Sequence, residues 1–139
     1  MQLMGRTEFE FDDLIWRIKI PGKVRFFAWL AIQGKCLTAD NLAKRNWPHN
    51  PLCPLCNLGA ETATHLLASC PFAAGIWGYC LTKYGFPLML MPGQNCSDLK
   101  ERWLNARNSL EAKRRSHFSS IVMTTWWFIW RERNERIFY

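Results

Sequence analysis

The sequence predicts a mostly α-helical, small domain organised around one cluster of cysteine and histidine side chains. Apolar residues recur at helical spacing in several segments, and prolines and glycines separate those segments. Between residues 53 and 70, three cysteines and one histidine are close enough in the chain to converge. The chain has 139 residues, 49% of them hydrophobic, which is enough to form the core of one domain.

Two helices are expected before this cluster. Between Lys23 and Gly34 the apolar residues follow helical spacing, and Gly34 is a natural helix end. The stripe consists of Val24, Phe27, Ala28, Ala31 and Ile32. Thr38 can cap a shorter helix over residues 39–45. Residues 47–51 are expected to form a loop, because their two prolines are incompatible with a helix.

Further helices are expected after the start of the cluster. A helix that begins near residue 61 carries His65, and Pro71 suits the first position of the next helix, which continues to Lys83. Two more helices are predicted over residues 98–110 and 112–137.

This pattern divides the chain into three predicted parts. Residues 1–84 form the helical domain that contains the Cys/His cluster, residues 85–96 form a linker rich in proline and glycine, and residues 97–139 form a C-terminal helical hairpin. The hairpin is expected to pack on the first part.

The spacing Cys-x2-Cys-x8-His-x4-Cys indicates a zinc site with the ligands Cys53, Cys56, His65 and Cys70. A Cys-x2-Cys turn lets two thiolates converge on one ion. His65 in the first turn of a helix and Cys70 just beyond its end can both point back to that turn. Three sulfurs and one imidazole nitrogen suit tetrahedral zinc. Because four protein ligands leave no position for water, we expect one structural Zn²⁺ and no catalytic ion.

Two alternatives remain for these residues. They could be unligated thiols and an imidazole, or the Cys-x2-Cys pair could have a redox role, although no strand precedes it as in thioredoxin-like proteins. We interpret Cys36 and Cys80 as packing residues and Cys96 as a loop residue.

The net charge of +7 is concentrated before the cluster. Residues 14–58 contain seven bases and one acid, a local charge of +6, and a basic surface of this kind favours phosphate backbones. A solvated surface without a partner is the alternative. The candidate nucleic-acid contacts are Lys23, Arg25, Lys35, Lys44, Arg45 and, as a stacking ring, Trp47.

Enzyme motifs and membrane segments are not evident in the sequence. It has no glycine-rich phosphate loop, no Gly-x-Ser-x-Gly and no His-Glu-x-x-His, so we expect a binding module without a small-molecule substrate. The longest apolar stretch, residues 121–130, is too short to span a bilayer. The start of the chain does not resemble a signal peptide, which favours a reducing, intracellular location in the nucleus or cytoplasm.

Several stretches resemble a known family. They are Pro-Gly-Lys-Val-Arg-Phe-Phe-Ala-Trp-Leu from Pro21, Gly-Lys-Cys-Leu-Thr-Ala-Asp-Asn-Leu from Gly34, the region Cys53–Trp77, and the tail Trp126–Phe138. Together they resemble the zinc-binding domain at the C-terminus of plant LINE-type (non-LTR retroelement) reverse transcriptases, and all four ligand positions of that family are filled.

The resemblance implies a zinc module of retroelement origin that helps to hold RNA or DNA. In such an element the polymerase and endonuclease lie upstream of this region. The alternative is a vestigial or domesticated interaction domain that docks on a protein through its aromatic helix at Trp126–Trp130.

Overall fold

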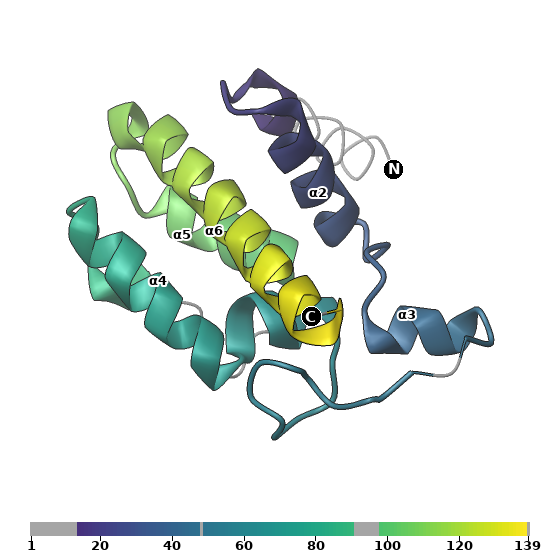
Figure 1. The fold of residues 1–139 in the computed structure, drawn as a ribbon. Helices are drawn as coiled ribbons and strands as arrows, with labels where there is room; N and C mark the ends of the chain where they lie inside the picture. Colours follow the sequence, from purple (N-terminus) through teal and green to yellow (C-terminus); the bar gives the residue numbers. More distant parts are fainter. Residues whose placement is uncertain (1–13, 48, 91–97, 139) are drawn as a thin grey trace.

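Helices make up most of the described part of the chain, in the order that the sequence predicts (Figure 1). The computed structural model describes residues 14–47, 49–90 and 98–138. Within these ranges there is no β-strand, only an isolated bridge between Leu52 and Ala60. The predicted mostly α-helical class is confirmed.

The first half contains the two expected helices. After a helical turn at residues 14–17, α2 spans Gly22–Ile32 and α3 spans Ala39–Lys44. Gly34 follows α2 with φ of 69°, a conformation that glycine adopts without steric cost. Thr38 occupies the N-cap of α3, but its hydroxyl donates to the carboxylate of Asp40 and does not accept a helix N–H.

The second half also follows the predicted order. The π-helical turn η1 (His65–Ser69) leads into α4 (Pro71–Lys83), with Pro71 at its first turn as expected. A short 3-10 helix, η2 (Leu88–Leu90), precedes α5 (Leu99–Asn108), which Asp98 caps by accepting the backbone N–H of Lys100 at 3.2 Å. The last helix is α6 (Ala112–Phe138).

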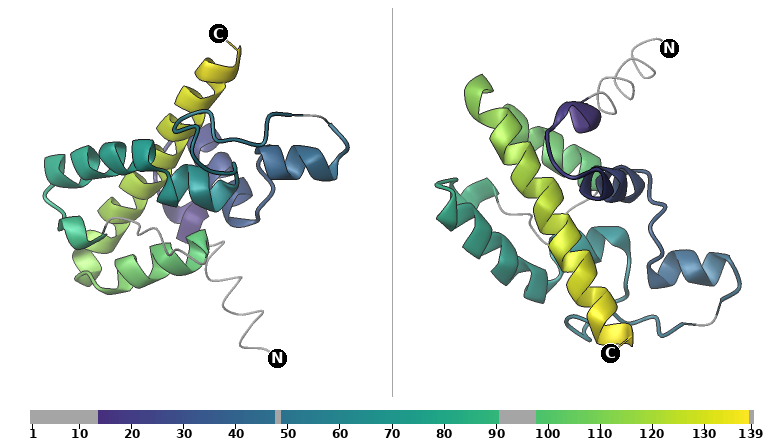
Figure 2. Two further views of the ribbon diagram at one scale, coloured as in Figure 1. Left: turned by 90° about the horizontal axis from the view of Figure 1, so that it is seen from below. Right: turned by 45° about the horizontal axis from the view of Figure 1, so that its top comes forward.

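Helix α6 lies at the centre of the molecule. It packs against α2, α4, α5 and η1, and in Figures 1 and 2 the helices α2 and α4 flank it on opposite sides. Its length explains this role, because 27 residues extend for about 40 Å and can contact every other long helix.

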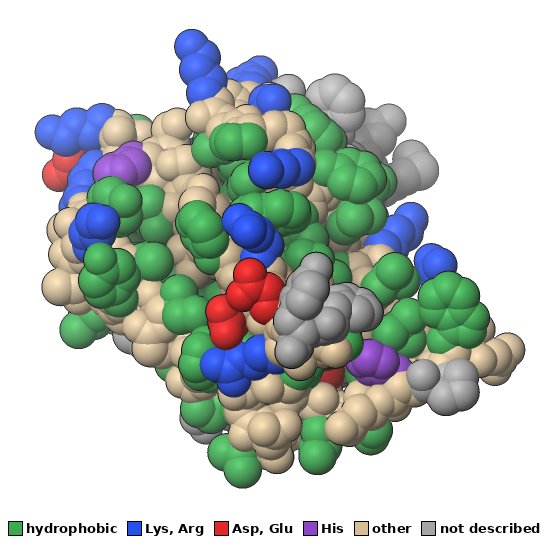
Figure 3. All heavy atoms as spheres, in the orientation of Figure 1, with side chains coloured by type: hydrophobic (Ala, Val, Ile, Leu, Met, Phe, Trp, Pro, Cys, Tyr) green, Lys and Arg blue, Asp and Glu red, His purple; other side chains and the backbone are tan. Residues whose placement is uncertain are grey.

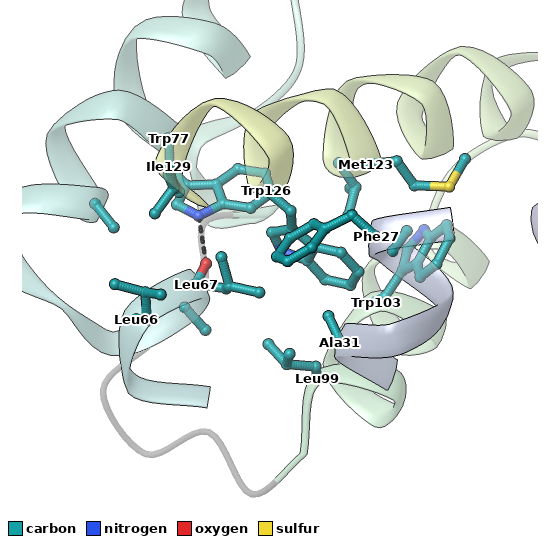
Figure 4. Packing of buried hydrophobic residues seen from close by; sticks show 14 of the residues in the cluster. Phe27, Ala31, Leu66, Leu67, Trp77, Leu99, Trp103, Met123, Trp126 and Ile129 are labelled. Atoms are coloured by element: carbon teal, nitrogen blue, oxygen red, sulfur yellow. Dashed lines mark hydrogen bonds between the residues drawn. The ribbon is translucent and has the colours of Figure 1, made fainter. Parts of the chain in front are cut away.

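Tryptophans fill the core along α6 (Figure 4). Trp103 and Trp126 meet edge to face with ring centroids 5.5 Å apart. Two buried indole N–H groups in this core have acceptors: Trp77 donates to the carbonyl of Leu67 at 2.9 Å, and Trp103 donates to the hydroxyl of Ser119 at 3.2 Å. These rings therefore bury a large apolar area while their polar atoms stay hydrogen-bonded.

One apolar cluster unites residues from both predicted parts of the chain. It includes Phe27 and Leu67 from the first part, Ile129 from the last helix, and Phe86 from the predicted linker, which is buried. Cys36 is buried and Cys80 is half-buried, in agreement with packing roles. Pro92, Gly93 and Cys96 lie outside the described residues.

The aromatic segment Trp126–Trp130 mostly faces the protein's own core. Trp126 and Ile129 are buried, and Trp127 and Trp130 pack against Phe27 at centroid distances of 6.0 and 5.1 Å. Phe128 is the exception, with 55% of its surface exposed. An amphipathic helix in a packed domain explains this arrangement without a partner.

Candidate metal centre

The first two cysteines lie in a tight loop held by backbone hydrogen bonds. The N–H of Asn57 donates to the carbonyl of Cys53, and the N–H of Cys53 donates to the carbonyl of Gly59, both at 2.8 Å. Asn57 has φ of 58°, a left-handed conformation that asparagine tolerates better than most residues. These bonds fold the chain so that Cys53 and Cys56 point to the same side.

The other two residues of the cluster flank η1. Thr62 accepts the backbone N–H of His65 through its hydroxyl at 3.1 Å, which fixes the start of this turn. The N–H of Cys70 donates to the carbonyl of His65 at 2.7 Å, and Pro71 then starts α4. The helical turn thus places His65 and Cys70 on the side that faces the loop.

The structure brings the four predicted residues together. Their donor atoms all lie within 4.8 Å of one another; Cys53 Sγ is 3.9 Å from Cys70 Sγ, and Cys56 Sγ is 3.3 Å from His65 Nε2. In a tetrahedral site with Zn–S bonds of about 2.3 Å, two sulfurs are about 3.8 Å apart, and sulfur and nitrogen about 3.6 Å. These two separations are therefore close to those of a zinc coordination sphere, and the four residues could hold a metal ion.

Burial and hydrogen bonding shift the pKa values of the cysteine thiols in opposite directions. Desolvation raises the pKa of Cys53 to about 12 and also raises the pKa of Cys70. Desolvation acts in the same direction on Cys56, but hydrogen bonds, first that from the N–H of Leu58, lower its pKa overall. Desolvation also lowers the pKa of His65, which favours the neutral imidazole that a metal requires. A bound cation would stabilise the buried sulfurs as thiolates, whereas without one they keep their protons.

Gly59 leaves room for the imidazole. A Cβ at this position would lie 3.2 Å from Cε1 of His65, which is closer than most Cβ contacts, and 3.5 Å from Nδ1, an ordinary contact distance. The loop and the histidine are therefore in direct contact, and only glycine avoids crowding the ring.

We expect Gly59→Ala to weaken zinc binding by about 10-fold, because His65 must shift by a few tenths of an ångström to admit the methyl group. Competition with a coloured zinc chelator measures this loss. Gly75→Ala is the matched control, since a Cβ there meets no atom within 4 Å. Equal zinc affinity in both variants would contradict the proposed packing.

A buried ion pair joins the loop to the last helix, and sequence reasoning missed it. The guanidinium of Arg133 donates to both carboxylate oxygens of Glu61 at 2.7 Å, with 4% and 0% of the two side chains exposed. Glu61 also accepts the N–H of Ala39 at 2.8 Å, and Arg133 donates to the carbonyl of Leu37 at 3.3 Å. The pair thus connects α3, the loop between Cys53 and Glu61 (the metal loop) and α6.

A second arginine of α6 contacts the same loop. Arg136 donates to the carbonyl of Leu55, inside the Cys-x2-Cys turn, at 3.4 Å, and its guanidinium lies 4.4 Å from the ring centroid of Phe72. No local spacing signals these contacts, because they cross most of the chain. The C-terminal end of α6 therefore supports the metal centre directly.

The predicted basic contacts lie outside the metal centre. Lys23, Lys35, Lys44, Arg45 and Trp47 are exposed, and the indole of Trp47 has 64% of its surface accessible. In Figure 3, lysine and arginine side chains are scattered over the visible face among apolar ones.

Arg25 differs from these residues because its guanidinium is used within the fold. It is half-buried, donates to the carbonyls of Trp16 and Ile18 at 3.1 and 3.2 Å, and lies 5.8 Å from the ring centroid of Trp16. These contacts hold the segment before α2 in place.

The fold and the Cys3His centre define a small helical zinc-binding domain whose ion is structural. Comparison with known families gives a match to the family described as zinc-binding in reverse transcriptase over residues 1–77, and the chain belongs to this family. Family and site together assign one structural zinc ion to the chain.

A curated relative is a putative ribonuclease H protein of Arabidopsis thaliana, which is 30% identical over 67 residues. The match covers 48% of this chain and 11% of the relative, so the chain corresponds to a small part of that protein. No solved structure matches the chain. Among the described residues, no helix is both long and apolar enough to cross a membrane.

Proposed function

We propose that this reverse-transcriptase-associated zinc domain, of LINE-type retroelement origin, is non-catalytic and binds RNA or DNA through sequence-independent phosphate contacts. The observation that supports this most directly is the segment after α3. Lys44 and Arg45 are exposed at the end of that helix, and Trp47 follows with 64% of its surface exposed. Cations beside an exposed indole are the combination that binds a single-stranded backbone and stacks on a base.

The zinc centre would act as the rigid support for this surface. The ion pair between Glu61 and Arg133 ties the loop to α6, and Glu61 also accepts the first N–H of α3 at Ala39. The position of α3 and its basic end is therefore coupled to the folded loop. In this proposal zinc fixes geometry, and the cations supply the affinity.

The surrounding charge also supports phosphate binding. Between residues 14 and 58, Asp40 is the only acid, and its carboxylate accepts the hydroxyl of Thr38. The basic side chains Lys23, Lys35, Lys44 and Arg45 are exposed and lie on α2, on the connection to α3, and at the end of α3. Such a surface releases counterions from a nucleic acid when it binds.

We expect the variant Lys23→Gln/Lys35→Gln/Lys44→Gln/Arg45→Gln to bind RNA and DNA oligonucleotides more weakly, to a similar degree for different sequences. The slope of log affinity against log salt should flatten by about 0.7–0.9 for each phosphate that the variant no longer neutralises. Fluorescence anisotropy across a salt series measures both quantities. Arg25 is left unchanged because its replacement would disturb the segment before α2.

Zinc content and the circular dichroism spectrum serve as controls, and both should match the wild type because exposed side chains contribute little to stability. Trp47→Ala should lower affinity for single strands by about 1–3 kcal/mol if the indole stacks on a base. If affinity and salt slope stay unchanged in the fourfold variant, this surface is not the nucleic-acid site.

Protein docking is the second proposal. Its support is narrower than the sequence indicates, because within Trp126–Trp130 only Phe128 is exposed. Phe128 borders a groove of about 220 Å³ between α4 and α6, where Tyr84 and Ile121 also lie. A partner held there would bind with little dependence on salt, in contrast to a nucleic acid.

A further inference from the structure

A hollow of about 490 Å³ lies at the end of the molecule away from the metal loop. It is formed by the segment before α2, the end of α5 and the first two turns of α6. From Ser116 to Arg133, the residue that holds the metal loop, the distance along α6 is about 25 Å. The hollow is therefore separate from both the zinc centre and the basic end of α3.

Three arginines and two serines line this hollow, together with apolar residues, and none of the described lining residues is acidic. The arginines are Arg17, Arg107 and Arg115, and the serines are Ser116 and Ser119. Its volume falls in the range typical of small-molecule sites, so it can admit a phosphate group with part of the attached sugar.

The two arginines from α5 and α6 are not neutralised by a carboxylate of the described chain. Arg115 donates to the carbonyls of Leu110 and Asn108 at 3.0 and 3.3 Å, and Arg107 makes a long contact of 3.5 Å with the side-chain oxygen of Asn108. All of these acceptors are uncharged. Within the described residues, the fold thus holds two guanidinium groups at one hollow without an opposing charge.

The electrostatic situation of Arg107 agrees with this geometry. Burial and the nearby charge of Arg115 both lower the pKa of Arg107. Repulsion between like charges that the fold holds together is relieved when an anion binds between them. Planar guanidinium groups are also the side chains best suited to bidentate contact with phosphate oxygens.

The start of α6 favours an anion here. The hollow includes Ala112 and Ser116 in the first turns of a 27-residue helix, where the helix dipole favours negative charge.

We propose that this hollow binds a phosphate group, with Arg107 and Arg115 as its main contacts. If the phosphate belongs to RNA or DNA, this inference rests on the proposed function. The hollow is then a second nucleic-acid contact, about 25 Å along α6 from the metal centre. Free phosphate presents the same chemistry. A strand that reaches both points would lie along α6.

The test uses the full chain with zinc bound and the variant Arg107→Gln. Arg107 is the suitable residue because, among the described residues, its guanidinium makes one long contact, whereas Arg115 holds the turn between α5 and α6. Arg131→Gln is the matched control: it removes the same charge from an exposed position of α6. We expect Arg107→Gln to weaken oligonucleotide binding about tenfold and to flatten the salt slope by about 0.7–0.9, with little change in the control.

A second measurement uses inorganic phosphate alone. Titration at low ionic strength should shift the side-chain Nε–Hε NMR signal of Arg107 in the wild type but leave that of Arg131 in place. A shift without any oligonucleotide binding would support the phosphate site and overturn the proposed function. If phosphate moves no signal of Arg107, and Arg107→Gln binds oligonucleotides as Arg131→Gln does, the hollow is not a phosphate site, even if the fourfold variant at α3 loses affinity.

Discussion

Removal of zinc is expected to unfold the domain. Structural zinc sites contribute about 10–16 kcal/mol of apparent binding free energy, while a whole domain is stable by only about 5–15 kcal/mol. In this chain Cys53, Cys70 and the neighbouring Leu66 and Leu67 are fully buried parts of the apolar core. Loss of the ion therefore opens the core itself and does not merely release a surface loop.

Elemental analysis of purified protein should give one zinc per chain, and a strong chelator should remove the cooperative thermal transition seen by circular dichroism. Cys56→Ser and Cys70→Ser should have the same effect as the chelator. Cys80→Ser is the control because this half-buried cysteine on α4 lies outside the cluster. A metal-free sample that keeps its spectrum and melting temperature would refute the structural role of zinc.

Loss of Arg133 should be the most damaging change away from the zinc ligands. Arg133→Met leaves the carboxylate of Glu61 buried without its cation, which costs about 3–5 kcal/mol. The effect should reach the zinc site, since Glu61 lies between the loop and η1 and also accepts the N–H of Ala39. We expect a lower free energy of unfolding and weaker zinc binding in the same variant.

The double variant Glu61→Gln/Arg133→Met distinguishes the cost of an unpaired buried charge from the cost of a packing defect. It removes both charges, while the glutamine oxygen can still accept the N–H of Ala39, so it should be more stable than Arg133→Met alone. Lys113→Gln breaks an exposed pair with Glu111 and should change stability by less than about 1 kcal/mol. Urea denaturation measures all three, and a double variant no better than the single one would contradict the argument.

The contacts of α6 explain why the metal centre depends on residues at the C-terminal end of this helix. Arg133 and Arg136 contact the metal loop from the C-terminal end of α6. Nearer the start of α6, Ser119 accepts a hydrogen bond from Trp103 of α5. The apolar residues of the helix fill the space between α2 and α4. The metal loop is therefore not an independently folded zinc-binding unit. It forms one end of a packed helical domain.

Local chemistry let the sequence alone determine the helical class and the set of metal-binding residues. Helical periodicity and the effect of proline depend on only a few neighbouring residues. The helices α4 and α6 begin at the predicted residues, Pro71 and Ala112. The four residues of the metal centre occupy only the stretch from Cys53 to Cys70, and the zinc chemistry itself restricts their types and spacing. Tertiary structure was not needed to identify them.

Only the tertiary structure decided which charged and aromatic side chains are available to a partner. Glu61 and Arg133 are 72 residues apart in the sequence, and no local pattern distinguishes them from solvated charges. Arg25 turns towards backbone carbonyls and Trp126 enters the core, while Arg107 and Arg115 meet at a hollow. The physical reason is that burial and the distance between charges depend on how distant segments pack, which short-range sequence patterns do not encode.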